Sequence, residues 1–161
     1  MPIKTQIWTV GSQPSQLREC TLSSEQLLED MIVSAPRVLS EEWMLIGRQE
    51  STGMGGRIDL LAIAPDASLV LIELKRDRTP REVVAQALDY ASWVEQLGAE
   101  DIAAIYKRNK KGADLAADFY QYFGLSLDED ALNQSHQIII VASGLDASTE
   151  RIVAYLSERD I

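Results

Sequence analysis

The 161-residue chain has few of the residues from which several common kinds of functional site are built. One cysteine, Cys20, excludes an internal disulfide framework and a zinc site made from cysteines. One histidine, His136, excludes histidine-rich metal sites, and no nucleophile-elbow motif lies near it to indicate a Ser-His-Asp triad. The longest apolar runs, such as 69–72 and 138–142, are too short to cross a bilayer, and no signal pattern opens the chain. We therefore predict a cytoplasmic protein that does not associate with membranes.

Basic residues are also scarce, because 15 lysines and arginines face 25 acidic residues and the formal net charge is −10. This balance argues against a simple electrostatic nucleic-acid binder, which needs cations to contact phosphates. The deficit is uneven, however, since residues 37–81 contain equal numbers of basic and acidic side chains and residues 107–111 read Lys-Arg-Asn-Lys-Lys. Two interpretations of these basic groups stay open, namely a solvated surface or cations beside a site.

Apolar residues make up 46% of the chain, which is typical of a globular protein and enough for one domain with a sizeable core. No internal repeat, low-complexity stretch or flexible linker divides it. We predict a single domain over residues 1–161, with an extended N-terminal segment over 1–22 and a helical insertion over 99–132.

Hydrophobic periodicity and turn residues predict the order of the elements. A helix between Ser24 and Pro36 precedes three closely spaced strands, which we expect to be antiparallel. A helix opened by Thr79-Pro80 then leads through the insertion to a fourth strand, which can return parallel. The predicted fold is α/β, with a mixed sheet flanked by helices in αβββαβ order. The expected strands are 43–50, 57–64, 69–75 and 137–142, and the helices after the first are 80–97, 99–107, 113–123 and 148–159.

Charged residues interrupt the two apolar middle strands at Asp59, Glu73 and Lys75. A three-residue loop over 65–67 sets a register in which Asp59 lies directly opposite Glu73, with Cβ atoms roughly 5 Å apart. Glu73 and Lys75 share a face because side chains alternate along a strand. The spacing therefore predicts that the three side chains converge at one end of a buried hairpin.

Two carboxylates this close repel each other, and their burial is unfavourable unless a positive charge compensates. A hard divalent cation such as Mg²⁺ does so, and carboxylates with a main-chain carbonyl, here that of Leu74, are its preferred ligands. Such a cation supports phosphodiester hydrolysis, with Lys75 assisting the attacking water. The alternative, in which Lys75 merely neutralises two carboxylates, stays open.

Asp59, followed after thirteen residues by Glu73-Leu74-Lys75, resembles the D-(x)n-(D/E)-x-K signature of the PD-(D/E)XK nuclease superfamily. Ile58 stands where that signature usually has proline. The surrounding segments resemble the catalytic domain of NucS (EndoMS)-like endonucleases, a RecB-like branch. The resemblance implies a restriction-endonuclease-like core and an Mg²⁺- or Mn²⁺-dependent endodeoxyribonuclease of DNA repair or defence. It rests on the segments 28–30 (LED), 46–49 (IGRQ), 56–61 (GRIDLL), 72–76 (IELKR) and 86–90 (QALDY).

The resemblance also implies roles for individual residues. Asp59 and Glu73 match metal ligands, with the Leu74 carbonyl, and Lys75 matches the catalytic lysine. Gln86 matches a glutamine that completes the site, and the alternative is a solvent-facing helix residue. Glu29 matches a glutamate that approaches the metal from outside the sheet, and the alternative is an exposed helix acid.

Four further residues are candidates for contacts with DNA: Arg48, Arg57, Arg76 and Tyr90. For Arg48 and Arg57 the alternative is a salt bridge to Glu50 or to the site carboxylates. Tyr90 lies one helical turn after Gln86, where it contacts either the DNA backbone or Gln86 itself.

Two features depart from what the resemblance implies. The net charge of −10 is unusual for a free-standing nuclease, and nothing here resembles the separate DNA-binding and dimerising domain of such enzymes. The chain also ends just after a helix, at Asp160-Ile161, where relatives continue into another strand, so it is either a short form or a truncated one. We therefore expect the last sheet position to be empty or filled by a second copy, and we predict a homodimer or a DNA-binding partner. A nuclease-fold binding or regulatory module without cleavage, and an acidic structural or toxin-neutralising protein, remain the alternative functions.

Overall fold

A four-stranded mixed sheet forms the centre of the computed structural model, which describes residues 7–18, 20–53, 55–79 and 81–159. Its strands lie in the order β3-β4-β5-β6. The first three are antiparallel neighbours and β6 runs parallel to β5, as the short and long connections predict. The predicted αβββαβ order and mixed sheet are therefore confirmed. The strands are β3 (Met44–Ser51), β4 (Arg57–Ile63), β5 (Leu69–Thr79) and β6 (His136–Leu145).

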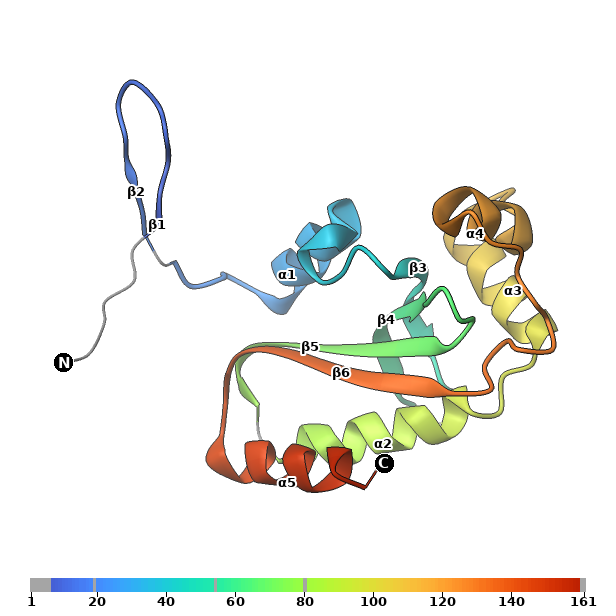
Figure 1. Ribbon diagram of the computed structural model, residues 1–161. Helices are drawn as coiled ribbons and strands as arrows, with labels where there is room; N and C mark the ends of the chain where they lie inside the picture. The colour runs from blue at the N-terminus through green and yellow to red at the C-terminus, as the bar shows by residue number, and fades with distance from the viewer. Residues whose placement is uncertain (1–6, 19, 54, 80, 160–161) are drawn as a thin grey trace.

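Helices flank this sheet, and a small hairpin projects away from it (Figure 1). Helix α1 packs near β5 on one side, whereas α2 and α5 lie together along the other. Helices α3 and α4 lie at the β3 end and occupy the stretch predicted as a helical insertion. The helices are α1 (Glu25–Ser34), the 3₁₀ turn η1 (Pro36–Val38), α2 (Glu82–Val94), α3 (Ala99–Asn109), α4 (Leu115–Phe123) and α5 (Ala147–Ser157), and the hairpin strands are β1 (Ile7–Trp8) and β2 (Gln16–Leu17).

Two hydrophobic clusters cover the two faces of the sheet. The alternation of side chains along β4 and β5 divides their apolar residues between these clusters. One cluster joins the strands to α2, α3 and α4 and includes Leu61, Ile63, Leu69 and Leu71. The other joins them to Ile32 of α1 and includes Leu60, Ala62, Val70 and Ile72.

The β4–β5 hairpin has the register that its loop length predicts. Leu60 pairs with Ile72 and Ile63 with Leu69, and the Ala64 N–H donates to the Ser68 carbonyl at 2.9 Å. The tight connection needs a left-handed residue, which is Ala67 with φ 65°. One step beyond the Leu60–Ile72 pair, this register brings Asp59 and Glu73 to the same end of the hairpin.

Element ends differ from expectation in two places. Strand β5 continues to Thr79, beyond the expected end at Lys75, because β6 keeps pairing alongside it after a register shift between Lys75 and Arg78. Helix α2 ends at Val94, since the chain tightens into i→i+3 bonds such as Leu97 N–H to the Val94 carbonyl. Pro80, the expected first residue of this helix, lies outside the described residues.

Strand β6 is an edge strand. Within the described ranges it pairs with β5 on one side and with no strand on the other. No helix in the described part of the chain has both the length and the apolar character that a bilayer span requires.

Candidate metal centre

Asp59 and Glu73 both lie at the open end of the β4–β5 hairpin, and hydrogen bonds fix both carboxylates. The Leu74 N–H donates to Asp59 Oδ2 at 2.8 Å, and the Gln49 amide donates to Asp59 Oδ1 at 3.0 Å. Glu73 is 1% exposed, and its Oε1 accepts from Lys75 Nζ at 2.7 Å. The main chain of β5 and the amine of Lys75 therefore tie the two acidic residues into one site.

The electrostatics of this site oppose a charged Glu73. Burial raises the pKa of Glu73 above its ordinary value of 4.5, the hydrogen bond from Lys75 lowers it, and the charges of Asp59 and Glu25 raise it further, so that the net shift is upward. Burial disfavours the charged form of Lys75, but the hydrogen bond to Glu73 and the acidic charges around it outweigh burial and raise its pKa. The site thus holds more negative charge than its single lysine balances.

The donor atoms fit a hard divalent cation. Glu73 Oε2 is buried and has no hydrogen-bond partner, which is costly for a carboxylate oxygen unless something else binds it. Among the described residues no group of three or more His, Cys, Asp or Glu side chains is placed to hold a metal. A cation here would therefore use Asp59, Glu73 and the Leu74 carbonyl and would keep several waters, which is the habit of Mg²⁺.

Helix α2 contributes Gln86 and Tyr90 near the start of β4. Gln86 Nε2 donates to the Tyr90 hydroxyl at 2.9 Å, and the Arg57 N–H donates to the same oxygen at 3.1 Å. Tyr90 is 6% exposed, so its ring belongs to the core and its hydroxyl is used inside the protein. Of the two contacts expected for Tyr90, the structure shows the one with Gln86, and Gln86 is half-buried instead of facing solvent. Gly56 permits this packing, because a Cβ there would lie 2.4 Å from Tyr90 Cε1.

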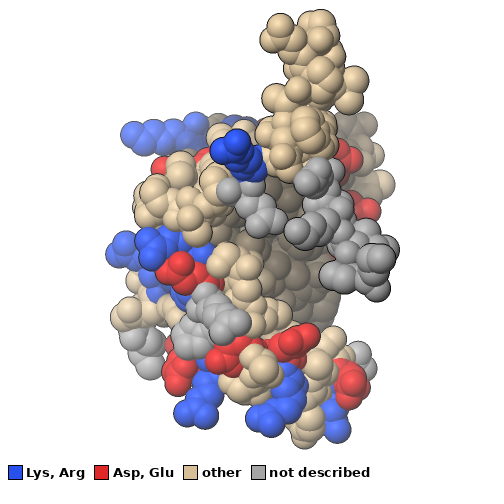
Figure 2. Space-filling view, turned by 90° about the vertical axis from the view of Figure 1, so that its left-hand side faces the viewer, with Lys and Arg blue, Asp and Glu red and all other residues tan. Residues whose placement is uncertain are grey.

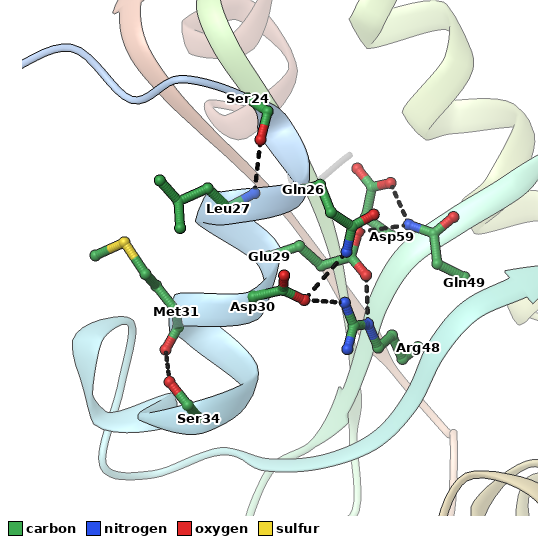
Figure 3. A network of polar contacts seen from close by, with 10 residues as sticks. All are labelled: Ser24, Gln26, Leu27, Glu29, Asp30, Met31, Ser34, Arg48, Gln49 and Asp59. Carbon is green, nitrogen blue, oxygen red and sulfur yellow. Dashed lines mark hydrogen bonds and ion pairs between the residues drawn. The ribbon is translucent and has the colours of Figure 1, made fainter.

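On the α1 side, a polar network links Glu29 to Asp59 (Figure 3). Glu29 is 4% exposed, so the alternative of an exposed helix acid is excluded. Its Oε1 accepts from Arg48 Nε, and its Oε2 accepts from Gln49 Nε2 at 2.7 Å. Arg48 also pairs with Asp30. Arg48 therefore forms salt bridges to α1 carboxylates instead of pairing with Glu50.

Sequence reasoning missed Gln49. This residue lies on β3 with φ 53°, a left-handed conformation that costs a non-glycine residue about 1–2 kcal/mol. Its amide nitrogen donates to both Glu29 and Asp59. Gln49 lies in the segment 46–49 that supports the family resemblance, but that segment gave it no role, and a polar residue within a predicted strand does not distinguish a site residue from a surface one.

The remaining candidates for DNA contacts have different surroundings. Arg57 is exposed and forms no ion pair among the described residues. Arg76 pairs with Asp77 at 2.7 Å and donates to the Ser23 carbonyl at 3.2 Å. Figure 2 shows acidic side chains among the basic ones on the face that it presents.

The basic segment over residues 107–111 packs against β3. Buried Glu50 accepts from Arg108 Nη2 at 2.9 Å and from Asn109 Nδ2 at 2.6 Å. A cleft runs along β3 between α1 and the α3–α4 pair, and both Lys110 and Arg48 line it. The sequence did not indicate the contact with Glu50, which fixes the cationic end of α3 to the strand that carries Gln49.

Comparisons with known proteins point to one family. Residues 24–113 match the family described as the endonuclease NucS C-terminal domain. No curated protein matches the chain. Among solved structures, a repair endonuclease from Pyrococcus abyssi aligns with 89% of this chain and 48% of its own at 19% identity and a TM-score of 0.54.

Two EndoMS structures are also similar. The apo form aligns with 89% of this chain and 47% of its own, at 20% identity and a TM-score of 0.50. EndoMS in a complex with double-stranded DNA aligns with 95% of this chain and 62% of its own, at 15% identity and a TM-score of 0.56. The chain thus spans about half the length of the first two relatives. At these identities the likeness shows a shared fold.

Proposed function

Because the chain belongs to the family of NucS endonuclease C-terminal domains, we propose that it is a metal-dependent endodeoxyribonuclease domain of the PD-(D/E)XK type. One observation carries this proposal: Glu73 presents a buried carboxylate oxygen without a partner, beside Asp59 and within reach of a lysine. A protein gains nothing in stability from such an oxygen, whereas a cation site needs it. We propose DNA repair or defence in the cytoplasm as its setting.

In this proposal Asp59, Glu73 and the Leu74 carbonyl hold Mg²⁺ or Mn²⁺. The bound cation would supply Lewis-acid stabilisation of negative charge that develops on the phosphate. Lys75 orients the attacking water and adds its own positive charge. Water adds to phosphorus as the bond to the leaving oxygen breaks, and the products are a phosphate monoester and a hydroxyl. We propose that Gln86, whose amide nitrogen donates to the Tyr90 hydroxyl, completes the site.

DNA is the proposed substrate despite the net charge of −10. Support comes from the exposed Arg57 and from the cationic end of α3, which Glu50 holds beside β3. Arg48 and Arg76 sit among carboxylates, so we expect them to contact phosphate less directly than Arg57.

We propose that a second copy or a DNA-binding partner supplies the affinity that this acidic chain lacks. The open edge of β6 offers a place for a second copy, because unpaired strand edges pair readily with another strand. Light scattering should then give twice the mass of one chain. A monomer at every concentration would exclude the second copy and leave a separate DNA-binding partner as the proposal.

Cleavage assays test the proposed function directly. The protein is incubated with single-stranded, branched and mismatched DNA at low salt, with Mn²⁺ or with EDTA. We expect the DNA to be cut in Mn²⁺ and to stay intact in EDTA. The rate of cutting in Mn²⁺ should fall at least about 100-fold in Glu73→Ala. Glu41→Ala is the matched control, since Glu41 is an exposed glutamate outside the site, and it should cut like the wild type.

The same assay decides between this function and the alternative of a binding module. Calorimetry that shows Mn²⁺ binding, together with no cutting of any substrate, would favour the module. Cutting that persists in EDTA or in Glu73→Ala would rule out the proposed site.

A further inference from the structure

Gln49 holds the only amide nitrogen in the described part of the chain that donates to two carboxylates at the site. Its Nε2 lies 2.7 Å from Glu29 Oε2 and 3.0 Å from Asp59 Oδ1. A primary amide has two N–H groups, so both bonds can form at once. In Figure 3 dashed lines join the Gln49 amide nitrogen to both carboxylates, which come from α1 and β4.

The backbone of Gln49 is strained to make this arrangement. Arg48 pairs with Leu60 and Glu50 with Ile58, so Gln49 lies opposite Asp59 in the β3–β4 ladder. At that position its φ is 53°, where glycine would be more favourable. A strained conformation of this kind is retained only where the surrounding contacts hold it in place, and such conformations concentrate at functional sites.

The bond from Gln49 is one of two that fix the Asp59 carboxylate. Oδ1 accepts from Gln49 and Oδ2 accepts from the Leu74 N–H at 2.8 Å. With one hydrogen bond on each oxygen, rotation of the carboxylate plane is restricted, and each oxygen presents its remaining lone pair in a defined direction. Gln49 is itself anchored, because its other acceptor, Glu29, is buried and paired with Arg48.

We propose that Gln49 is a positioning residue that orients Asp59 for the cation, and that Glu29 and Arg48 serve to hold Gln49. This inference rests on the proposed function and deepens it. It gives Glu29 a role that requires no contact with the metal. Partners that orient a metal ligand typically change metal affinity by about 10–100-fold when they are removed.

Gln49→Gly is the decisive variant, because glycine accepts φ 53° and only the side chain is lost. We expect Mn²⁺ affinity, measured by calorimetry, to fall about 10–100-fold. Relief of the backbone strain stabilises the variant and loss of the two hydrogen bonds destabilises it, so circular dichroism checks that it stays folded. Ala67→Gly is the matched control: Ala67 has φ 65° in the distant β4–β5 loop, and this variant should bind Mn²⁺ like the wild type.

A second measurement needs neither metal nor activity. In the metal-free protein we expect the Leu74 amide, which donates to Asp59 Oδ2, to be protected from hydrogen exchange. Gln49→Gly should lose that protection while the amide of Ile72 keeps it. Wild-type Mn²⁺ affinity in Gln49→Gly overturns the proposal. If the wild type itself binds no Mn²⁺, the proposed function fails, and the Leu74 amide decides by itself whether Gln49 orients Asp59.

Discussion

At the scale of single residues, Glu73 shows how a binding site reduces the stability of the protein that carries it. Its carboxyl group is 1% exposed, one oxygen lacks a partner, and the negative charge of Asp59 lies nearby. Each of these disfavours the ionised form that a cation would need. Metal-free protein is therefore expected to become more stable when this charge is removed.

Glu73→Gln tests that expectation through its pH dependence. The pKa of Glu73 is raised above 4.5, so its contribution to stability is fully present below pH 4.5 and is lost as the pH rises through the folded-state pKa. In EDTA, the unfolding midpoint of the variant relative to the wild type should therefore rise between about pH 4 and about pH 8. For a chain of this size about 1 kcal/mol corresponds to about 2–4 °C. A constant difference across this range would contradict the assignment.

At the scale of elements, the placement of α3 against β3 depends on a close approach at Gly47. A Cβ at Gly47 would lie 2.9 Å from Glu50 Cγ, 3.1 Å from Ile105 Cγ2 and 3.2 Å from Leu61 Cβ. The same approach brings Arg108 to Glu50. The glycine thus determines whether the cationic end of α3 lies beside β3.

Gly47→Ala should destabilise the protein by about 1–3 kcal/mol, because Leu61 and Ile105 are in the core and cannot both move. Chemical unfolding followed by tryptophan fluorescence measures the change. Gly11→Ala is the control, since nothing lies within 4 Å of a Cβ there, and its effect should stay within about 0.5 kcal/mol. Equal effects of the two variants would show that the close approach does not matter.

At the scale of the whole molecule, the net charge of −10 must be overcome locally if DNA is the substrate. Long-range repulsion is screened by salt over about 8–10 Å, so a few well-placed cations can dominate at the surface of contact. Lys107 and Lys111 are exposed and form no ion pair among the described residues. They are the lysines of the 107–111 segment that are free to contact phosphates.

The double variant Lys107→Gln/Lys111→Gln should weaken DNA binding and flatten its salt dependence. Each lost phosphate contact reduces the slope of log affinity against log salt by about 0.7–0.9. Fluorescence anisotropy with labelled DNA and catalytically inactive Glu73→Ala protein measures this slope. Arg159→Gln, at the end of α5, is the control and should leave the slope unchanged. An unchanged slope in the double variant would show that these lysines of the 107–111 segment do not contact DNA.

Much of the hairpin that carries the site could be predicted from the sequence. The run of apolar residues, the three-residue loop and the period of two along a strand fix which residues face each other, and these are local properties of the chain. They placed Asp59 and Glu73 at one end of β4 and β5, and they placed Lys75 on the same side as Glu73.

Contacts between distant segments followed only from the tertiary structure. The burial of Glu29, the pairing of Glu50 with Arg108 and the two bonds of Gln49 each join residues on different elements. Helix packing sets such distances, and many packings satisfy the same hydrophobic pattern. The left-handed backbone of Gln49 is also a consequence of its surroundings, because isolated glutamine prefers negative φ.

The sequence by itself thus determined the fold class, the register of the β4–β5 hairpin and the end of the hairpin at which Asp59 and Glu73 lie, because side-chain alternation and loop length act within a few residues. Only the tertiary structure decided how those carboxylates are held. That depends on where α1, α2 and α3 settle against the sheet, and the free energy that selects this arrangement comes from the whole core.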